Sequence, residues 1–170
     1  MMEPVPQMKH AWIVAIPLAL SVSSFAAPAQ AQDYRKLSTQ WQGKERPLDI
    51  VNGGRHNNMA HLADDDDVSG QSWRLRKDGN SYRLTTAFRG DGMCLDVNNG
   101  GSLNNFVSLQ PCGNYSGQFW RMHKEGQWFR LTTEFRGRNM CLDIVNGGAQ
   151  DGMAQLTPCG NFSGQLWRLD

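Results

Sequence analysis

One sequence pattern occurs three times in this chain, at a spacing of 47 residues and without insertion or deletion. Each copy ends in a Gln-x-Trp motif, and these motifs begin at Gln71, Gln118 and Gln165. An aspartate, a glycine and a leucine keep the same register: Asp49, Asp96 and Asp143; Gly43, Gly90 and Gly137; Leu37, Leu84 and Leu131. A fixed period of this length means that one supersecondary unit is used several times. A binding site written into that unit can therefore exist in up to three versions.

Within the second copy, four short segments are rich in aromatic and β-branched residues or alternate in polarity, which is typical of β-strands. They are residues 82–86, 93–97, 106–109 and 119–122. Turns rich in asparagine and glycine separate the strands, and a polar loop is expected at residues 113–117. No window keeps a 3.6-residue period, so little helix is expected.

Three copies of four strands predict an all-β fold of twelve short strands with pseudo-threefold symmetry. A propeller usually needs about four to eight blades, so three copies are too few for that architecture. Closure on a threefold axis into a barrel capped by hairpins leaves no free sheet edge. Trp73, Trp120 and Trp167 are then expected in the core, each burying on the order of 200 Å².

Residues 1–31 are typical of a secretory signal peptide. Lys9 and His10 precede an apolar run at 11–27, and Ala29-Gln30-Ala31 is a small-residue cleavage site. The alternative is a membrane anchor, but the run is shorter than the roughly 20 residues of a typical span. We expect cleavage after Ala31 and a secreted or periplasmic protein with no membrane span. The remaining single domain is 32–170, with repeats at about 33–75, 76–122 and 123–170.

The whole chain has a formal net charge of +1, and removing the leader takes away one base and one acid, Lys9 and Glu3. The mature domain is therefore also nearly neutral. Such a balance offers no electrostatic attraction toward nucleic acid or anionic membranes. Nucleic acid is not an expected partner.

The four cysteines form two pairs with the same spacing of 18 residues, Cys94 with Cys112 and Cys141 with Cys159. In the first copy the matching positions are Pro47 and Asp65, so both cysteines are absent together. The simplest explanation is one disulfide inside each of the later copies, each worth about 3 kcal/mol by loop entropy. A zinc site is the alternative, although the spacing matches such sites poorly.

The Gln-x-Trp endings, the Cys-Leu-Asp strands at 94–96 and 141–143, and the triplication resemble the ricin-type β-trefoil lectins. The resemblance extends over residues 34–170 and implies a β-trefoil with up to three shallow sugar pockets. Each pocket would use the aspartate of its copy as a hydrogen-bond acceptor, which matches Asp49, Asp96 and Asp143. It would also use a polar residue on the third strand and the motif glutamine. These match His61, Ser108 and Gln155, and Gln71, Gln118 and Gln165.

The family often has a stacking aromatic two residues after that polar position, where this chain has Ala63, Gln110 and Thr157. Tyr115 and Phe162, in the loop before Gln-x-Trp, are candidate replacements, whereas the first copy has Val68. We therefore expect the second and third pockets to bind sugar best. Both the glutamines and the aspartates also have a structural interpretation, as ties within the fold and its turns.

Other polar clusters suggest metal or catalytic sites less strongly. The acidic run 64–67 could bind calcium or form a solvated loop, and His56 and His61 nearby could suggest zinc. We expect no metal and no cofactor, because the run occurs in one copy and lacks the spacing of a calcium loop. None of the histidines recurs at the period or lies in a nucleophile motif, so no catalytic activity is expected.

Together these features predict an exported carbohydrate-binding module whose partner is a glycan or glycoconjugate. The alternative is a protein-binding β-trefoil, similar to an inhibitor or a toxin subunit, with vestigial sugar pockets.

Overall fold

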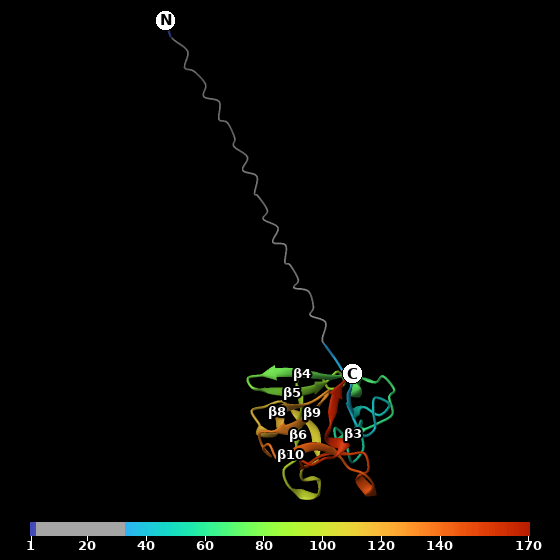
Figure 1. Ribbon diagram of the computed structural model, residues 1–170. Coiled ribbons are helices and arrows are strands. Elements are labelled where there is room, and N and C mark those ends of the chain that lie inside the picture. Colours follow the sequence, from blue (N-terminus) through green and yellow to red (C-terminus); the bar gives the residue numbers. More distant parts are fainter. Residues whose placement is uncertain (3–32) are drawn as a thin grey trace. The chain divides into compact units, whose positions relative to one another are not determined.

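The computed structural model describes residues 1–2 and 33–170 (Figure 1). The predicted signal peptide and its cleavage site therefore lie almost wholly outside the described residues. The chain divides into two units, Met1–Ala31 and Gln32–Asp170, and every strand of the described residues lies in the second unit. Among the described residues, no helix is both long enough and apolar enough to cross a membrane.

The described part of the chain contains twelve strands, as the sequence predicted, together with five short 3-10 helices. The strands are β1 (Leu37–Thr39), β2 (Leu48–Ile50), β3 (Ala60–Leu62), β4 (Trp73–Asp78), β5 (Ser81–Thr86), β6 (Met93–Val97), β7 (Val107–Pro111), β8 (Trp120–Glu125), β9 (Trp128–Thr133), β10 (Met140–Ile144), β11 (Ala154–Pro158) and β12 (Trp167–Leu169). The 3-10 helices are η1 (Ser69–Gln71), η2 (Gly101–Leu103), η3 (Ser116–Gln118), η4 (Gly148–Gln150) and η5 (Ser163–Gln165).

The four strands expected in the second copy are present as β5 to β8, with ends that differ by at most three residues. The loop expected at residues 113–117 is partly ordered, because its last two residues begin η3. This helix is the Ser-Gly-Gln segment that recurs as η1 and η5. One turn of 3-10 helix therefore leads directly into each motif tryptophan.

Six of the strands form an antiparallel sheet in the order β1-β12-β9-β8-β5-β4. The two edges of this sheet meet through Arg35 and Trp73, whose backbone groups exchange hydrogen bonds of 2.7 and 2.8 Å. The remaining strands form three hairpins, β2-β3, β6-β7 and β10-β11, linked to one another by single bridges. A closed six-stranded barrel with three capping hairpins is the β-trefoil.

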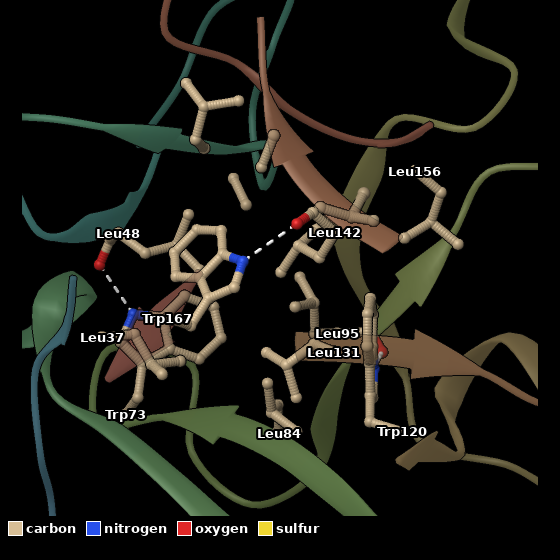
Figure 2. Close-up of a cluster of buried hydrophobic side chains, with 14 of the residues drawn as sticks. Leu37, Leu48, Trp73, Leu84, Leu95, Trp120, Leu131, Leu142, Leu156 and Trp167 are labelled. Carbon is tan, nitrogen blue, oxygen red and sulfur yellow. Dashed lines mark hydrogen bonds between the residues drawn. The ribbon is translucent and has the colours of Figure 1, made fainter. Parts of the chain in front are cut away.

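The core is built from side chains at equivalent positions of the three copies (Figure 2). Trp73, Trp120 and Trp167 have no exposed surface. Each indole N–H donates to a leucine carbonyl on the first hairpin strand of its own copy. The pairs are Trp73 with Leu48 at 2.7 Å, Trp120 with Leu95 at 2.8 Å and Trp167 with Leu142 at 2.9 Å. The tryptophans thus fill the core without leaving a buried donor unpaired.

Both predicted disulfides are present, Cys94–Cys112 and Cys141–Cys159. Each joins the first strand of a hairpin to the end of the second. In the first copy, Lys36 contributes an ion pair with Asp65, the residue at the place of the second cysteine, and another with Asp67 at 3.4 Å. Ion pairs therefore lie near the position that a disulfide occupies in the other two copies.

Replacing Trp120 by phenylalanine should lower the free energy of unfolding by about 1–3 kcal/mol, because the buried Leu95 carbonyl loses its donor. Urea unfolding measures the difference. The matched control is Trp128→Phe, since Trp128 is partly exposed and its ring lies 5.3 Å from the Arg168 guanidinium. Equal costs for the two variants would contradict the assigned role of the indole bond.

Candidate functional site

Three pockets occupy equivalent positions, one for each copy of the repeat. We call them the first, second and third pocket, after the copy that supplies the aspartate: Asp49, Asp96 or Asp143. Their volumes are about 490, 340 and 300 Å³. Each is lined by the aspartate, the residue that follows it, and the serine and glycine of the adjoining 3-10 helix. The repeat therefore builds one open pocket three times.

Each aspartate side chain is fixed from two directions. Its Oδ1 atom accepts a hydrogen bond from the amide of the next residue, at 2.7 Å in the first and second copies and 2.8 Å in the third. Its Oδ2 atom accepts from the motif glutamine, at 3.4, 3.0 and 2.9 Å in the three copies. The carboxylates of Asp96 and Asp143 are thus held more firmly than that of Asp49.

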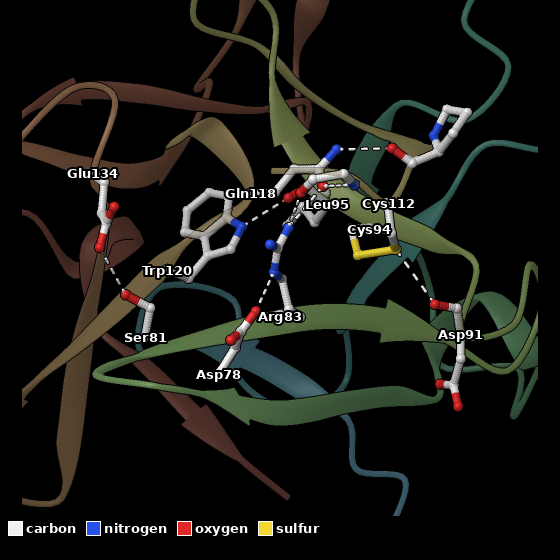
Figure 3. Close-up of polar contacts among 12 residues, drawn as sticks. Asp78, Ser81, Arg83, Asp91, Cys94, Leu95, Cys112, Gln118, Trp120 and Glu134 are labelled. Carbon is white, nitrogen blue, oxygen red and sulfur yellow. Dashed lines mark hydrogen bonds and ion pairs between the residues drawn. A yellow bond between two sulfur atoms is a disulfide. The ribbon is translucent and has the colours of Figure 1, made fainter. Parts of the chain in front are cut away.

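The motif glutamines hydrogen-bond to the aspartates, and Gln118, which Figure 3 shows beside Arg83, illustrates the arrangement. Its Nε2 atom donates to Asp96 and also to the Pro111 carbonyl, each at 3.0 Å. Its Oε1 atom accepts from the Gly113 amide and from Arg83 Nη1, each at 2.9 Å. Both donors and both acceptor positions of the amide are therefore occupied.

Gln165 repeats this pattern with Arg130 in place of Arg83. Gln71, Gln118 and Gln165 have no exposed surface at all. The expectation that these glutamines contact a sugar does not fit their burial. The structure supports the other interpretation, in which they orient the carboxylates that a ligand would meet.

A glycine precedes each glutamine for a steric reason. A Cβ atom added at Gly70, Gly117 or Gly164 would lie 2.1, 2.2 or 2.5 Å from Oδ1 of the aspartate in the same copy. Backbone strain is not involved, since these glycines do not have the positive φ of the turn glycines. The inward rotamer of the aspartate therefore requires glycine at this position.

The third-strand polar residues lie in different surroundings. Ser108 is buried, donates to Asn98 at 2.9 Å and accepts from Gln110 at 2.9 Å. Neither Ser108 nor Gln155 is among the residues that line the second and third pockets. His61 does line the first pocket, opposite Asp49 in the β2-β3 ladder.

Tyr115 and Phe162 lie where the sequence placed them, on the rims of the second and third pockets. They are 61% and 58% exposed, and each ring lies against the glycine two residues earlier, Gly113 or Gly160. Val68 takes the equivalent place in the first pocket and is 44% exposed. Exposed rings beside a carboxylate thus occur in two of the three pockets.

Every pocket also contains an aromatic residue from the following copy of the repeat, which was not predicted from the sequence. Phe88 lines the first pocket, Phe135 the second, and Trp41, from the first copy, the third. The signal was available, because these residues are 47 positions apart within a Thr-x-aromatic-x-Gly pattern. Spacing within one copy gave no reason to assign them to a neighbour's pocket.

Burial affects the charge of two pocket residues. The pKa of Asp96 is raised above its usual value, chiefly by burial, although the Gln118 and Val97 hydrogen bonds oppose the shift. The pKa of His61 is lowered, again mainly by burial, which favours the neutral imidazole at neutral pH.

The acidic run at 64–67 is countered by basic side chains of the first copy. Lys36 pairs with Asp65 and Asp67, and Arg46 Nε lies 3.5 Å from Asp64. Within residues 33–170, no group of three or more histidine, cysteine or acidic side chains is arranged to hold a metal ion. The run therefore has a structural explanation in ion pairing.

The family "Ricin-type beta-trefoil lectin domain" matches residues 81–170, which is more than half of the chain. The chain belongs to this family. The matched residues include most of the second repeat and all of the third, with both disulfides and both exposed rim aromatics. No curated protein sequence matches the chain.

Solved structures share the β-trefoil fold. The designed 3-fold symmetric protein ThreeFoil is 25% identical, with a TM-score of 0.66 over 80% of this chain and 96% of that chain. The Macrolepiota procera ricin B-like lectin, solved in complex with lactose, is 18% identical, with a TM-score of 0.62 over 85% and 99%. An exo-beta-1,3-galactanase from Clostridium thermocellum, 1,3Gal43A, is 19% identical, with a TM-score of 0.65 over 85% of this chain and 31% of that chain.

The steric role of Gly117 is testable by a double-mutant cycle. Gly117→Ala should lower the free energy of unfolding by about 1–3 kcal/mol, because Asp96 must rotate outward and leave buried donors unpaired. In an Asp96→Ala background the same substitution should cost much less. Equal costs in both backgrounds, measured by urea unfolding, would show that the carboxylate does not dictate the glycine.

The raised pKa of Asp96 predicts a specific pH dependence of stability. The folded state binds this proton more tightly than the unfolded state, so the stabilisation is present below about pH 3.9 and is lost as the pH rises through the folded-state pKa. Carboxyl ¹³C NMR should place the Asp96 midpoint above the usual range. The corresponding fall in unfolding free energy should be absent from Asp96→Asn.

Proposed function

We propose that this protein is an exported carbohydrate-binding module without catalytic activity, and that it binds a sugar ring in the second and third pockets. The observation that carries the proposal is the repeated combination of an anchored carboxylate and an exposed aromatic ring. Asp96 with Tyr115 and Asp143 with Phe162 each line one pocket. Family membership supports the same class of ligand.

The chemistry of a pyranose matches this combination. Its hydroxyl groups donate to a carboxylate in charge-assisted hydrogen bonds, which are stronger than neutral ones. Its C–H face is apolar and gains free energy when it leaves water against an aromatic ring. The held carboxylate also loses little rotamer freedom on binding, which lowers the entropic cost. Tyr115 and Phe162 keep more than half of their surface free for such a contact.

The first pocket is expected to contribute least to sugar binding. Val68 replaces the rim aromatic, and the bond from Gln71 to Asp49 is the longest of the three, at 3.4 Å. Its lining is also more apolar, with Phe88 and Val68 beside Ile50. A pocket with a loosely held acceptor and no exposed rim aromatic should bind a sugar with lower affinity.

The non-catalytic part of the proposal rests on the count of carboxylates. Glycoside hydrolysis commonly uses two carboxyl groups about 5–10 Å apart. In the described part of the chain, each of the three pockets is lined by a single acidic residue, Asp49, Asp96 or Asp143. Export is supported by the two disulfides, since such bonds persist in oxidising compartments.

The experiment is a glycan array with the disulfide-bonded protein, followed by calorimetric titration of the glycans that bind. Tyr115→Ala/Phe162→Ala should weaken the affinity by about tenfold or more, from lost apolar contact. Asp96→Ala/Asp143→Ala should weaken it further, whereas the matched rim variant Val68→Ala should have little effect. Because both rings are exposed, the first double variant should retain its unfolding temperature.

Two results would contradict the proposal. An array on which the folded protein binds no glycan would favour the protein-binding alternative. A glycan affinity that survives both double variants would place the binding site elsewhere.

A further inference from the structure

The turn that carries Trp41 places this ring at the third pocket. Gly43, with φ 66°, donates its amide to the Thr39 carbonyl at 2.9 Å and closes the turn. The Gln40 amide donates to the Leu166 carbonyl at 2.8 Å, which ties the turn to the third copy of the repeat. Trp41 is partly buried against the core and lines the pocket that contains Asp143. The first copy thus completes a pocket that begins in the third.

The equivalent rings of the other copies are partly covered by cations. The Arg89 guanidinium lies 4.1 Å from the Phe88 ring centre, and that of Arg136 lies 4.1 Å from Phe135. Both arginines are also held by loop asparagines: Arg89 by Asn57 and Asn58, and Arg136 by Asn104. One face of each phenylalanine is therefore already occupied by its own chain.

Trp41 differs from these two rings. The residue that follows it is Gln42, at the position of Arg89 and Arg136. Within residues 33–170, no cation is found over the Trp41 ring. An indole also has the largest ring surface of the natural side chains and the strongest attraction for positively polarised groups.

The carboxylate of the third pocket is held by more hydrogen bonds than those of the other two pockets. Asp143 Oδ2 accepts from Gln165 at 2.9 Å and from the Thr157 hydroxyl at 3.0 Å, in addition to the amide bond at Oδ1. The residues that line the pocket carry one negative charge and no positive charge. Such a pocket repels a carboxylated or sulfated sugar and accepts a neutral one.

Building on the proposed function, we propose that the third pocket is the principal sugar site and that Trp41 is its specificity-determining residue. The ligand class is a neutral pyranose. Its apolar face stacks on Trp41 or between Trp41 and Phe162, and its hydroxyls donate to Asp143. Because Trp41 belongs to the first copy, the bound sugar bridges the two ends of the folded domain.

The test is a titration of the full chain with galactose, glucose, N-acetylgalactosamine and glucuronate, followed by NMR of the indole N–H groups. The Trp41 signal should shift with one of the neutral sugars and not with glucuronate. The buried residues Trp73, Trp120 and Trp167 serve as internal references. Affinity should fall about tenfold in Trp41→Ala, the loss for roughly 60 Å² of apolar contact. Trp41→Phe should recover most of it.

A second variant places a cation near the Trp41 ring without removing the ring. Gln42→Arg reproduces the residue found after Phe88 and Phe135 and should weaken binding of the neutral sugar severalfold. It remains informative if Trp41→Ala lowers the folding yield, since Gln42 is partly exposed and its side chain does not form the core.

The outcomes separate this inference from the proposed function. If no neutral sugar or glycan binds the folded wild type, the proposed function fails and the inference fails with it. If sugar binds but Trp41→Ala and Gln42→Arg leave the affinity unchanged while Asp96→Ala abolishes it, the second pocket is the principal site. Only the inference is then overturned.

Discussion

Each repeat is closed by two hydrogen bonds between its Gln-x-Trp segment and a Leu-Asp pair on the first hairpin strand. In the second copy, Trp120 donates to the Leu95 carbonyl and Gln118 donates to Asp96. The tryptophan bond lies in the core, whereas the glutamine bond ends at the carboxylate that faces the pocket. The contacts that fold the repeat therefore also orient the aspartate carboxylate that is the candidate sugar contact. A buried amide or indole left unpaired would cost more than the bond itself contributes.

The same pair of hydrogen bonds explains why the three pockets share one arrangement of aspartate, glutamine and glycine but differ in their aromatic residues. The aspartate, its glutamine and the preceding glycine keep the same contacts in every copy, although the bond from the glutamine to the aspartate is longer in the first copy. The rim residue and the aromatic from the next copy face solvent or a neighbour, so they can differ without disturbing the core. The differences between copies are concentrated on the pocket surfaces outside the core, as expected of loops on a rigid scaffold.

The first repeat shows how a copy can lose its disulfide and keep its fold. Lys36 replaces the arginine that contacts the motif glutamine in the other copies, and it pairs with Asp65 and Asp67 instead. Partly exposed ion pairs of this kind contribute little each, so the hairpin depends mainly on its buried apolar residues. Leu48, Ala60 and Leu62 supply these, each at most 3% exposed.

The sequence by itself determined what happens inside one repeat. The period predicted the strands, the barrel, the disulfides and the core tryptophans, because their partners lie within a single copy at fixed spacing. Only the tertiary structure decided what crosses between copies. Trp41 lines a pocket whose aspartate lies about a hundred residues away in the sequence, and Phe88 and Phe135 each line the pocket of the preceding copy. Ring closure creates such contacts, and no spacing within one copy encodes them.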